Sequence, residues 1–286
     1  MIKEIAVIGA GTMGSGIALA CASAGYRVLL YDGFPEALEK GKNAISKNID
    51  YLIHKGKISS DTASGFHANI AYVNRLDLCK VNLVIEAIIE KPEAKAEVFR
   101  ELALINEPEC MLVSNTSSLS INQLQKNIPN PGRFAGLHFF NPAHIMKLVE
   151  VVRGEDTSVQ TIDNLVSFCK TLGKVPVVCN NAPGFIVNRV ARNFYLEPLR
   201  IAETTTATPE MIDLVLENSG FKMGPFRLMD LIGMDINYAV SQSLYEALNE
   251  PGRLKPSELQ KSKVDQGKLG RKSGSGFYDY STQTNA

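Results

Sequence analysis

The chain has 286 residues, 45% of them hydrophobic, which is enough apolar material for two domains with separate cores. Lysine plus arginine and aspartate plus glutamate both number 30, and this balance argues against a general electrostatic attraction to nucleic acid or to an anionic membrane. The five cysteines are scattered without a C-x-x-C pair, which argues against a disulfide framework or a zinc site and suits a reducing compartment.

The amino-terminal residues lead directly into a strand-like run. No apolar signal segment or arginine-rich presequence precedes that run, and no apolar stretch approaches the length that spans a membrane. We therefore expect a cytoplasmic protein without a membrane partner. The same sequence is compatible with a processed mature form.

The first predicted elements are a strand, a glycine-rich turn and a helix. Residues 5–8 form a β-branched run, the motif G-x-G-x-x-G follows, and a helical pattern continues until Gly25. In this context Gly9 permits a tight turn, Gly11 lets the backbone approach a pyrophosphate, and Gly14 allows close helix packing. The candidate cofactor-binding residues of this turn are Gly9, Gly11, Thr12, Met13 and Gly14.

The second predicted strand, residues 27–31, ends at Asp32. An acid at this spacing after the glycine motif is typical of a group that binds both hydroxyls of the adenosine ribose. A carboxylate there repels a 2′-phosphate, and the following residues 33–35 include no arginine to hold one, so NAD is favoured over NADP. The alternative is that Asp32 is an ordinary helix N-cap ahead of Pro35.

The next segment predicts a helical hairpin inserted into the sheet order. A polar helical pattern runs from Pro35 to about residue 58, and residues 59–61 offer caps for a second helix. The rhythm of a parallel sheet then resumes with strands over residues 82–87 and 111–114, a helix over 92–106 and a short helix over 121–127.

Two segments, residues 87–90 and 115–118, follow strand ends, and each contains at least one polar side chain. Because the carboxyl ends of parallel strands face the ligand crevice, these residues are placed to contact cofactor or substrate. Ser117 is one such residue, and it is equally well explained as a helix cap.

A histidine and a glutamate stand at the edges of two apolar runs farther along. His138 follows the strand-like residues 133–137, and Glu150 lies inside the apolar run 148–152. An unpaired buried carboxylate is costly, so Glu150 needs a partner, and His138 is the candidate. A carboxylate bound to one ring nitrogen orients the other and stabilises the protonated ring, which describes a general base. The alternative is a core histidine with all its hydrogen bonds satisfied and an unrelated edge-strand glutamate.

The second half of the chain changes from mixed to helical periodicity. A helix over 161–172 and a strand over 174–178 are followed by a break at 180–184, beyond which helices are predicted over 185–204, 210–218 with Thr208 as cap, and 235–248. We therefore predict an α/β Rossmann-type dinucleotide-binding domain with an inserted helical hairpin, residues 1–182, followed by an all-α domain, residues 183–286.

Two features of the helical half suggest contacts with a ligand. Asn188, just inside the first helix, is predicted to face back across the crevice, or else to be an ordinary surface residue. The basic, glycine-rich tail 267–278 suits a loop that folds over an anionic ligand or a neighbouring subunit, or a flexible linker. The residues after Tyr280 are predicted to be disordered.

Six motifs taken together resemble the L-3-hydroxyacyl-CoA dehydrogenase family, with the bacterial 3-hydroxybutyryl-CoA dehydrogenases most similar in length and architecture. These motifs span nearly the whole chain and comprise residues 9–14, 114–118, 136–142, 146–150, 183–189 and 267–272. The resemblance implies NAD-dependent oxidation of (S)-3-hydroxyacyl-CoA to 3-ketoacyl-CoA, and the reverse, with short acyl chains such as 3-hydroxybutyryl-CoA and acetoacetyl-CoA.

The resemblance also implies roles for individual residues. His138 is then the general base and Glu150 its orienting partner, while Ser117 and Asn188 bind near the reacting oxygen and the base. The residues implied at the dinucleotide, beside the glycines, are Asp32, Glu90, Lys95, Asn115 and Lys272. Lys55 falls where the family places a lysine for the coenzyme A moiety, and Asn48 stands where some members carry a serine.

Members of the family commonly form homodimers through the helical domain, so a homodimer is expected, with the helical domain contributing to substrate binding and dimerisation. Two other functions remain open at this point. One is an NAD-dependent dehydrogenase of a free hydroxy acid or sugar acid, and the other is a non-catalytic dinucleotide-binding protein.

Overall fold

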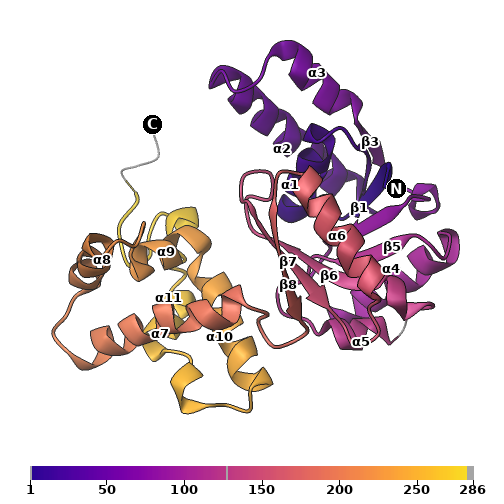
Figure 1. Ribbon diagram of the computed structural model, residues 1–286. Coiled ribbons are helices and arrows are strands. Elements are labelled where there is room, and N and C mark those ends of the chain that lie inside the picture. Colours follow the sequence, from indigo (N-terminus) through magenta and orange to yellow (C-terminus); the bar gives the residue numbers. More distant parts are fainter. Residues whose placement is uncertain (1, 127, 282–286) are drawn as a thin grey trace. The chain divides into compact units, whose positions relative to one another are not determined.

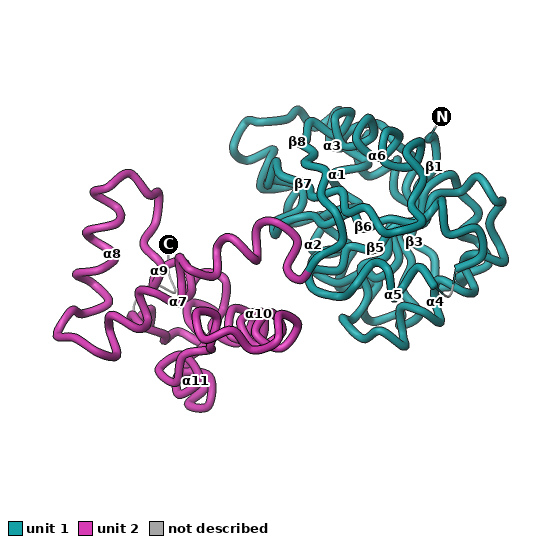
Figure 2. Tube along the Cα trace, turned by 60° about the horizontal axis from the view of Figure 1, so that its bottom comes forward, with its two compact units in different colours: residues 1–182 teal, residues 183–286 magenta. Residues whose placement is uncertain are grey.

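The computed structural model describes residues 2–126 and 128–281, and the chain divides into two compact units, unit 1 (Met1–Ala182) and unit 2 (Pro183–Ala286) (Figure 2). Unit 1 combines a mostly parallel sheet with helices, and unit 2 is built from helices (Figure 1). This architecture confirms the predicted fold class. Within the described residues, no helix has both the length and the apolar character needed to cross a membrane.

The sheet of unit 1 has the order β3-β2-β1-β4-β5-β6-β7-β8. The first six strands are mutually parallel, β7 is antiparallel to β6, and β8 is parallel to β7. The order of the first six is that of a dinucleotide-binding sheet. In such a sheet β2 and β3 are added on one side of β1, and β4, β5 and β6 are added on the other side. The strands are β1 Glu4–Ile8, β2 Arg27–Tyr31, β3 Ile70–Val73, β4 Leu83–Glu86, β5 Met111–Ser114, β6 Phe134–Phe139, β7 Leu148–Arg153 and β8 Val175–Asn180.

Helices cover both faces of this sheet. Residues of α1 and α6 share one buried apolar cluster with alternate residues of the strands. The connections through α4 and α5 run to the other side of β1, and right-handed crossovers therefore place these two helices on the opposite face. The helices of unit 1 are α1 Thr12–Ser23, α2 Pro35–His54, α3 Ser60–Ala68, α4 Pro92–Ile105, α5 Ile121–Gln125 and α6 Val159–Thr171, with short 3-10 turns at Leu76–Leu78 and Pro131–Arg133.

Most predicted elements of unit 1 are present, including the helical hairpin, which is formed by α2 and α3 (Figure 1). The strand β3 was missed, because it has only four residues at the edge of the sheet and just one of them, Ile70, is fully buried. The last strand begins and ends later than predicted, at Val175 and Asn180. The short helix was predicted to reach residue 127, which lies outside the described residues.

Unit 2 consists of α7 Val187–Thr204, α8 Pro209–Asn218, α9 Pro225–Ile232, α10 Met234–Ala247 and α11 Glu258–Asp265, with 3-10 turns at Gly252–Leu254 and Arg271–Ser273. Its core includes Leu199, Phe226 and Met234. The helices α9 and α11 were not predicted. In α11 the only fully buried residue is Gln260, so the helix carries no apolar stripe that a sequence pattern would reveal.

The described part of the carboxyl-terminal tail is packed on unit 2. The buried carboxylate of Asp230 in α9 accepts hydrogen bonds of 2.9 Å from the amides of Phe277 and Tyr278, and the Tyr278 hydroxyl donates to Asp213 at 2.7 Å. The Phe277 ring also packs edge-on against Phe226. The alternative that the tail is a flexible linker is therefore wrong for its described residues. The disorder predicted beyond Tyr280 falls mainly on residues 282–286, which are outside the described residues.

Candidate active site

The feature with the clearest chemical meaning is the contact between His138 and Glu150. The Nδ1 atom of His138 lies 2.7 Å from Oε2 of Glu150, and the two residues are 6% and 1% exposed. With Glu150 ionised and the ring neutral, Nδ1–H donates to the carboxylate, so the Nε2 atom is the basic position of the ring. The expected contact is present, in surroundings where water screens the two groups little.

The register of two strands produces this contact. His138 in β6 and Glu150 in β7 are directly opposite in the antiparallel pair, so their side chains leave the sheet on the same face. The neighbouring residues Phe139 and Val149, also opposite each other, are buried on the other face. The ring of Phe140 lies 4.5 Å from that of His138 and contributes to its burial.

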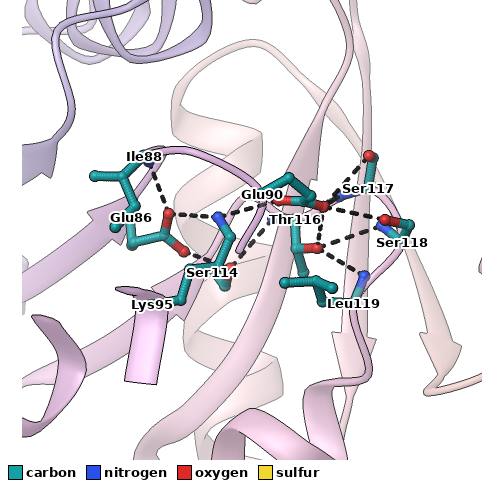
Figure 3. A network of polar contacts seen from close by, with 9 residues as sticks. All are labelled: Glu86, Ile88, Glu90, Lys95, Ser114, Thr116, Ser117, Ser118 and Leu119. Atoms are coloured by element: carbon teal, nitrogen blue, oxygen red, sulfur yellow. Dashed lines mark hydrogen bonds and ion pairs between the residues drawn. The ribbon is translucent and has the colours of Figure 1, made fainter. Parts of the chain in front are cut away.

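The end of β5 is joined to the same region. The Asn115 side chain accepts a hydrogen bond of 2.9 Å from the Phe139 amide, which holds the turn after β5 against the residue that follows the histidine. Ser117, two residues farther, donates its amide to Glu90 at 2.9 Å (Figure 3). The N-cap of α5 is Ser120, whose side chain accepts from the Gln123 amide, so the helix-cap alternative for Ser117 is wrong.

Glu90 gathers several donors from this turn. Its Oε1 accepts from the Thr116 hydroxyl at 2.5 Å and from Ser117 and Ser118, while Oε2 lies 3.1 Å from Nζ of Lys95 (Figure 3). Burial acts to raise the pKa of Glu90, but the ammonium of Lys95 and the donors outweigh it and lower that pKa. Glu90 is therefore held as an anion at the start of the turn that carries Ser117.

Lys95, expected at the dinucleotide, is 1% exposed and lies between two carboxylates. Its ammonium is 2.5 Å from Oε1 of Glu86, a residue that the sequence analysis did not single out. Glu86 ends β4 and is fully buried, and it also accepts from Ser114 and from the Ile88 amide (Figure 3). The signal that would have identified it is the same as for Glu150, an acid inside an apolar strand.

The glycine turn has the shape that a pyrophosphate requires. A Cβ atom on Gly14 would lie 1.7 Å from the carbonyl oxygen of Gly9, and one on Gly9 would lie 2.7 Å from that of Ala87, so both positions need glycine. A Cβ on Gly11 would have no neighbouring atom within 4 Å. The helix α1 begins with Thr12 and Met13, and no side chain accepts a hydrogen bond from the amides of its first turn. The turn is tightly packed on its inner side and open on its outer side, as expected for backbone approach to a phosphate.

Asp32 lies beside this turn. Its Oδ2 accepts a hydrogen bond of 2.9 Å from the Ala10 amide and its Oδ1 accepts one of 3.0 Å from the Phe34 amide. The helix α2 begins at Pro35 without a side-chain cap, so the N-cap alternative for Asp32 is wrong. The carboxylate is joined to the glycine turn, in the position expected for a ribose ligand.

The remaining predicted residues belong to other elements of the chain. Asn48 is on α2, and Lys55, at the end of that helix, places its ammonium 5.6 Å from the Tyr51 ring centre. Asn188, in the first turn of α7, belongs to unit 2, and so does Lys272, whose ammonium binds both oxygens of Asp235 at 2.6 and 2.7 Å.

Comparison with known proteins identifies the family of the chain. Family models of 3-hydroxyacyl-CoA dehydrogenase match the chain as the NAD-binding domain over residues 4–182 and as the C-terminal domain over residues 184–280. A 3-hydroxyadipyl-CoA dehydrogenase of Escherichia coli K12 is 44% identical over the whole chain, which spans 60% of that relative's length.

Two further relatives match over nearly their full length. A Deinococcus radiodurans protein named probable 3-hydroxybutyryl-CoA dehydrogenase is 39% identical over 97% of this chain and 100% of its own. The crystal structure of (S)-3-hydroxybutyryl-CoA dehydrogenase from Ralstonia eutropha superposes with a TM-score of 0.93, at 36% identity, over 98% of this chain and 99% of that one. The chain belongs to the 3-hydroxyacyl-CoA dehydrogenase family and is an NAD-dependent oxidoreductase.

Proposed function

We propose that this chain catalyses the NAD-dependent oxidation of short-chain (S)-3-hydroxyacyl-CoA to 3-ketoacyl-CoA, and the reverse reaction. The observation that carries the proposal is the buried His138–Glu150 pair, whose Nδ1 and Oε2 atoms are 2.7 Å apart and whose residues are directly opposite each other in two strands of a dinucleotide-binding sheet. The names of the relatives support the substrate class, since 3-hydroxyadipyl and 3-hydroxybutyryl thioesters share the 3-hydroxyl group and coenzyme A.

In this proposal the Nε2 atom of His138 takes the proton of the substrate's 3-hydroxyl group. NAD held by the residues assigned below would supply the acceptor for the hydride that leaves the same carbon. Glu150 keeps the ring in the tautomer whose Nε2 is basic, and then stabilises the imidazolium that forms. In the reverse direction the imidazolium returns the proton to the developing alkoxide. Ser117 and Asn188 hydrogen-bond near the reacting oxygen and the base.

The residues that we assign to the dinucleotide are those of the glycine turn, Asp32, Glu90, Lys95, Asn115 and Lys272. The inner side of the turn excludes any Cβ at Gly9 or Gly14, and its outer side is open at Gly11, which fits a pyrophosphate against the backbone. Asp32, bound to the amide of Ala10, suits a ribose diol and disfavours a 2′-phosphate.

For coenzyme A we propose the α2–α3 hairpin, with Lys55 and Asn48 as contacts. Lys55 is exposed, and α2 carries Lys40, Lys42 and Lys47 as well, so this helix offers several cations to the phosphates of the nucleotide part.

We also propose that unit 2 is the substrate and dimerisation domain, and that the protein is a homodimer. A groove of about 420 Å³ runs between α7 and α8, and its lining is mainly apolar, including Phe194, Ile201, Met211 and Val215. Met211 and Val215 are 59% and 64% exposed, which is unusual for side chains of this type unless a second surface covers them. Light scattering should give twice the monomer mass of 31.2 kDa for the wild type and the monomer mass for Met211→Glu; a monomeric wild type refutes the dimer.

A cytoplasmic location is part of the proposal. All five cysteines are free thiols and four of them are buried, which suits a reducing compartment.

The experiment that tests the function follows NADH loss with acetoacetyl-CoA and with longer 3-ketoacyl-CoA thioesters, with NADPH as the matched cofactor control. We expect turnover with NADH and acetoacetyl-CoA and little with NADPH. Free acetoacetate and sugar acids are the substrates of the alternative, so turnover with these and none with the thioesters would replace the proposed function by a dehydrogenase of free acids.

A further inference from the structure

The starting point is a buried lysine that the proposed chemistry does not use. Lys174, just before β8, is 8% exposed, and its ammonium donates to the carbonyl oxygens of Ala143 at 2.7 Å and Met146 at 2.8 Å. Burial lowers the pKa of this ammonium, so its charged form carries a cost that the contacts must offset. Both acceptors lie in residues 142–147 of the segment between β6 and β7 (the 142–147 loop). The lysine therefore fastens the connection between the two strands of the proposed catalytic pair.

The loop has further hydrogen bonds that define its shape. The amides of Ile145 and Met146 donate to the Pro142 carbonyl at 3.0 and 2.9 Å, which closes a tight turn. The carbonyl of the last loop residue accepts from the Val175 amide at 2.8 Å and attaches the loop to the start of β8. Lys174 satisfies two other loop carbonyls, and removing it would leave them without this donor, which is unfavourable at a buried position.

The loop also rests on the helix that starts at the glycine turn. Ala143 is 1% exposed and belongs to the apolar cluster that includes α1. A Cβ atom on Gly16 of α1 would lie only 3.2 Å from the Ala143 Cβ, less than the roughly 3.5–4.0 Å of a favourable carbon contact. The neighbouring Ser15 hydroxyl donates to the carbonyls of Ala10 and Gly11 at 2.9 and 2.8 Å. The loop thus packs closely on a part of α1 that is itself tied to the glycine turn.

These contacts connect two parts of the proposed site that lie on different faces of the sheet. The strands β1 and β6 are parallel members of one sheet, so the glycine turn and the loop are at the same edge. His138 and Glu150 leave the sheet on one face, while Phe139 and Val149 belong to the apolar cluster with α1 on the other. The loop passes from the strand that carries the histidine to the face that carries α1.

We propose that Lys174 is a positioning residue, which fixes His138 relative to the glycine turn by fastening the 142–147 loop on Gly16 of α1. The inference rests on the proposed function, in which the turn holds the dinucleotide and His138 is the base. Hydride transfer and proton transfer then occur at neighbouring atoms of one substrate. A small shift of the histidine strand relative to the dinucleotide helix therefore slows the reaction without removing any group that binds the dinucleotide.

The first test is Lys174→Met, which keeps much of the bulk and removes the charge and the donors. NADH affinity, measured by fluorescence titration, should stay close to that of the wild type, because the glycine turn keeps its own contacts. With saturating acetoacetyl-CoA, kcat per NADH-binding site should fall by about 10–100-fold, as expected for a misplacement of up to about 1 Å. Counting sites by the same titration removes any unfolded fraction from the comparison. Lys170→Met, at an exposed lysine of α6, is the matched control and should behave as the wild type.

A second pair of variants tests the contact between loop and helix without changing Lys174. Gly16→Ala forces Ala143 to move by a few tenths of an ångström, and kcat per site should fall by about 3–10-fold. The double variant Gly16→Ala/Ala143→Gly moves the methyl group from the loop to the helix. The nearest loop atom to the new Cβ is then the backbone nitrogen of residue 143, at 3.4 Å, so most of the lost kcat should return. This pair decides the question if Lys174→Met does not fold.

Three outcomes would overturn the inference. Wild-type kcat per site in both Lys174→Met and Gly16→Ala would show that the loop does not influence the reaction. A loss of NADH affinity that parallels the loss of kcat would mean that the contacts hold the glycine turn itself. A double variant as slow as Gly16→Ala would show that the fit of loop and helix is not what matters. A wild type that binds NADH but reduces no acyl-CoA counts instead against the proposed function, which separates the two failures.

Discussion

Replacing Glu150 by glutamine is the sharpest test of the proposed chemistry. The change keeps the size of the side chain and removes its charge, 2.7 Å from Nδ1 of His138 and at 1% exposure. For two charges about 4 Å apart and an effective dielectric constant of about 20, Coulomb's law gives an interaction of about 4 kcal/mol. About 1.4 kcal/mol corresponds to a factor of ten in rate. If the imidazolium is fully formed in the transition state, losing its interaction with the Glu150 carboxylate would therefore lower kcat by about 10³-fold.

A second effect acts in the same direction. The amide group that Glu150→Gln introduces would be able to donate to Nδ1, and the ring proton would then sit on Nε2, where the substrate hydroxyl needs an acceptor. We therefore expect kcat to fall by about 10²–10³-fold. The lower value applies if the His138 ring is only partly protonated in the transition state, and the higher value applies if it is fully protonated. The fall should be present at all substrate concentrations, because the lost interaction forms only as the proton moves.

The assay measures kcat from NADH absorbance at saturating acetoacetyl-CoA, NADH affinity by fluorescence titration, and the melting temperature. Glu109→Gln, at an exposed glutamate of the same unit, is the matched control. Unchanged turnover in Glu150→Gln would refute the pairing as part of catalysis. Loss of NADH binding and of thermal stability together with turnover would assign the pair a folding role.

Individual contacts give three further predictions. His138→Gln should abolish turnover and leave NADH affinity near normal, as measured by the same titration; joint loss of both would refute its role as base. Gly14→Ala places a Cβ 1.7 Å from the Gly9 carbonyl oxygen and should destabilise unit 1 by about 1–3 kcal/mol in thermal or urea unfolding while weakening NADH binding, whereas Gly65→Ala, where a Cβ meets nothing within 4 Å, should do neither. Asp230→Asn sets an amide group against a backbone amide of the tail, at a cost of about 1–3 kcal/mol, and should make residues 267–280 sensitive to limited proteolysis; a tail as resistant as in the wild type would contradict this anchoring.

The nucleotide-binding part of the fold was predictable because its signals are local. A β-branched strand, the spaced glycines and the acid at the end of the next strand occupy the first 32 residues, and each has a physical reason that needs no distant contact. The pairing of His138 with Glu150 was predictable for a different reason. An acid in an apolar run requires a partner, and the histidine was the suitable group nearby.

The tertiary structure decided what local patterns do not encode. The antiparallel register of β6 and β7 places His138 opposite Glu150, and a shift of one residue would have sent the two side chains to different faces. The strand β3 has only four residues and the helix α11 has no apolar stripe, so both depend on contacts with neighbouring elements, β3 with β2 and α11 with α10. A lysine is usually a surface residue, and nothing in the sequence around Lys95 indicates that it is buried. The packing of α4 against the end of β4 encloses its ammonium between two carboxylates. The opposite charges offset the cost of burying one another.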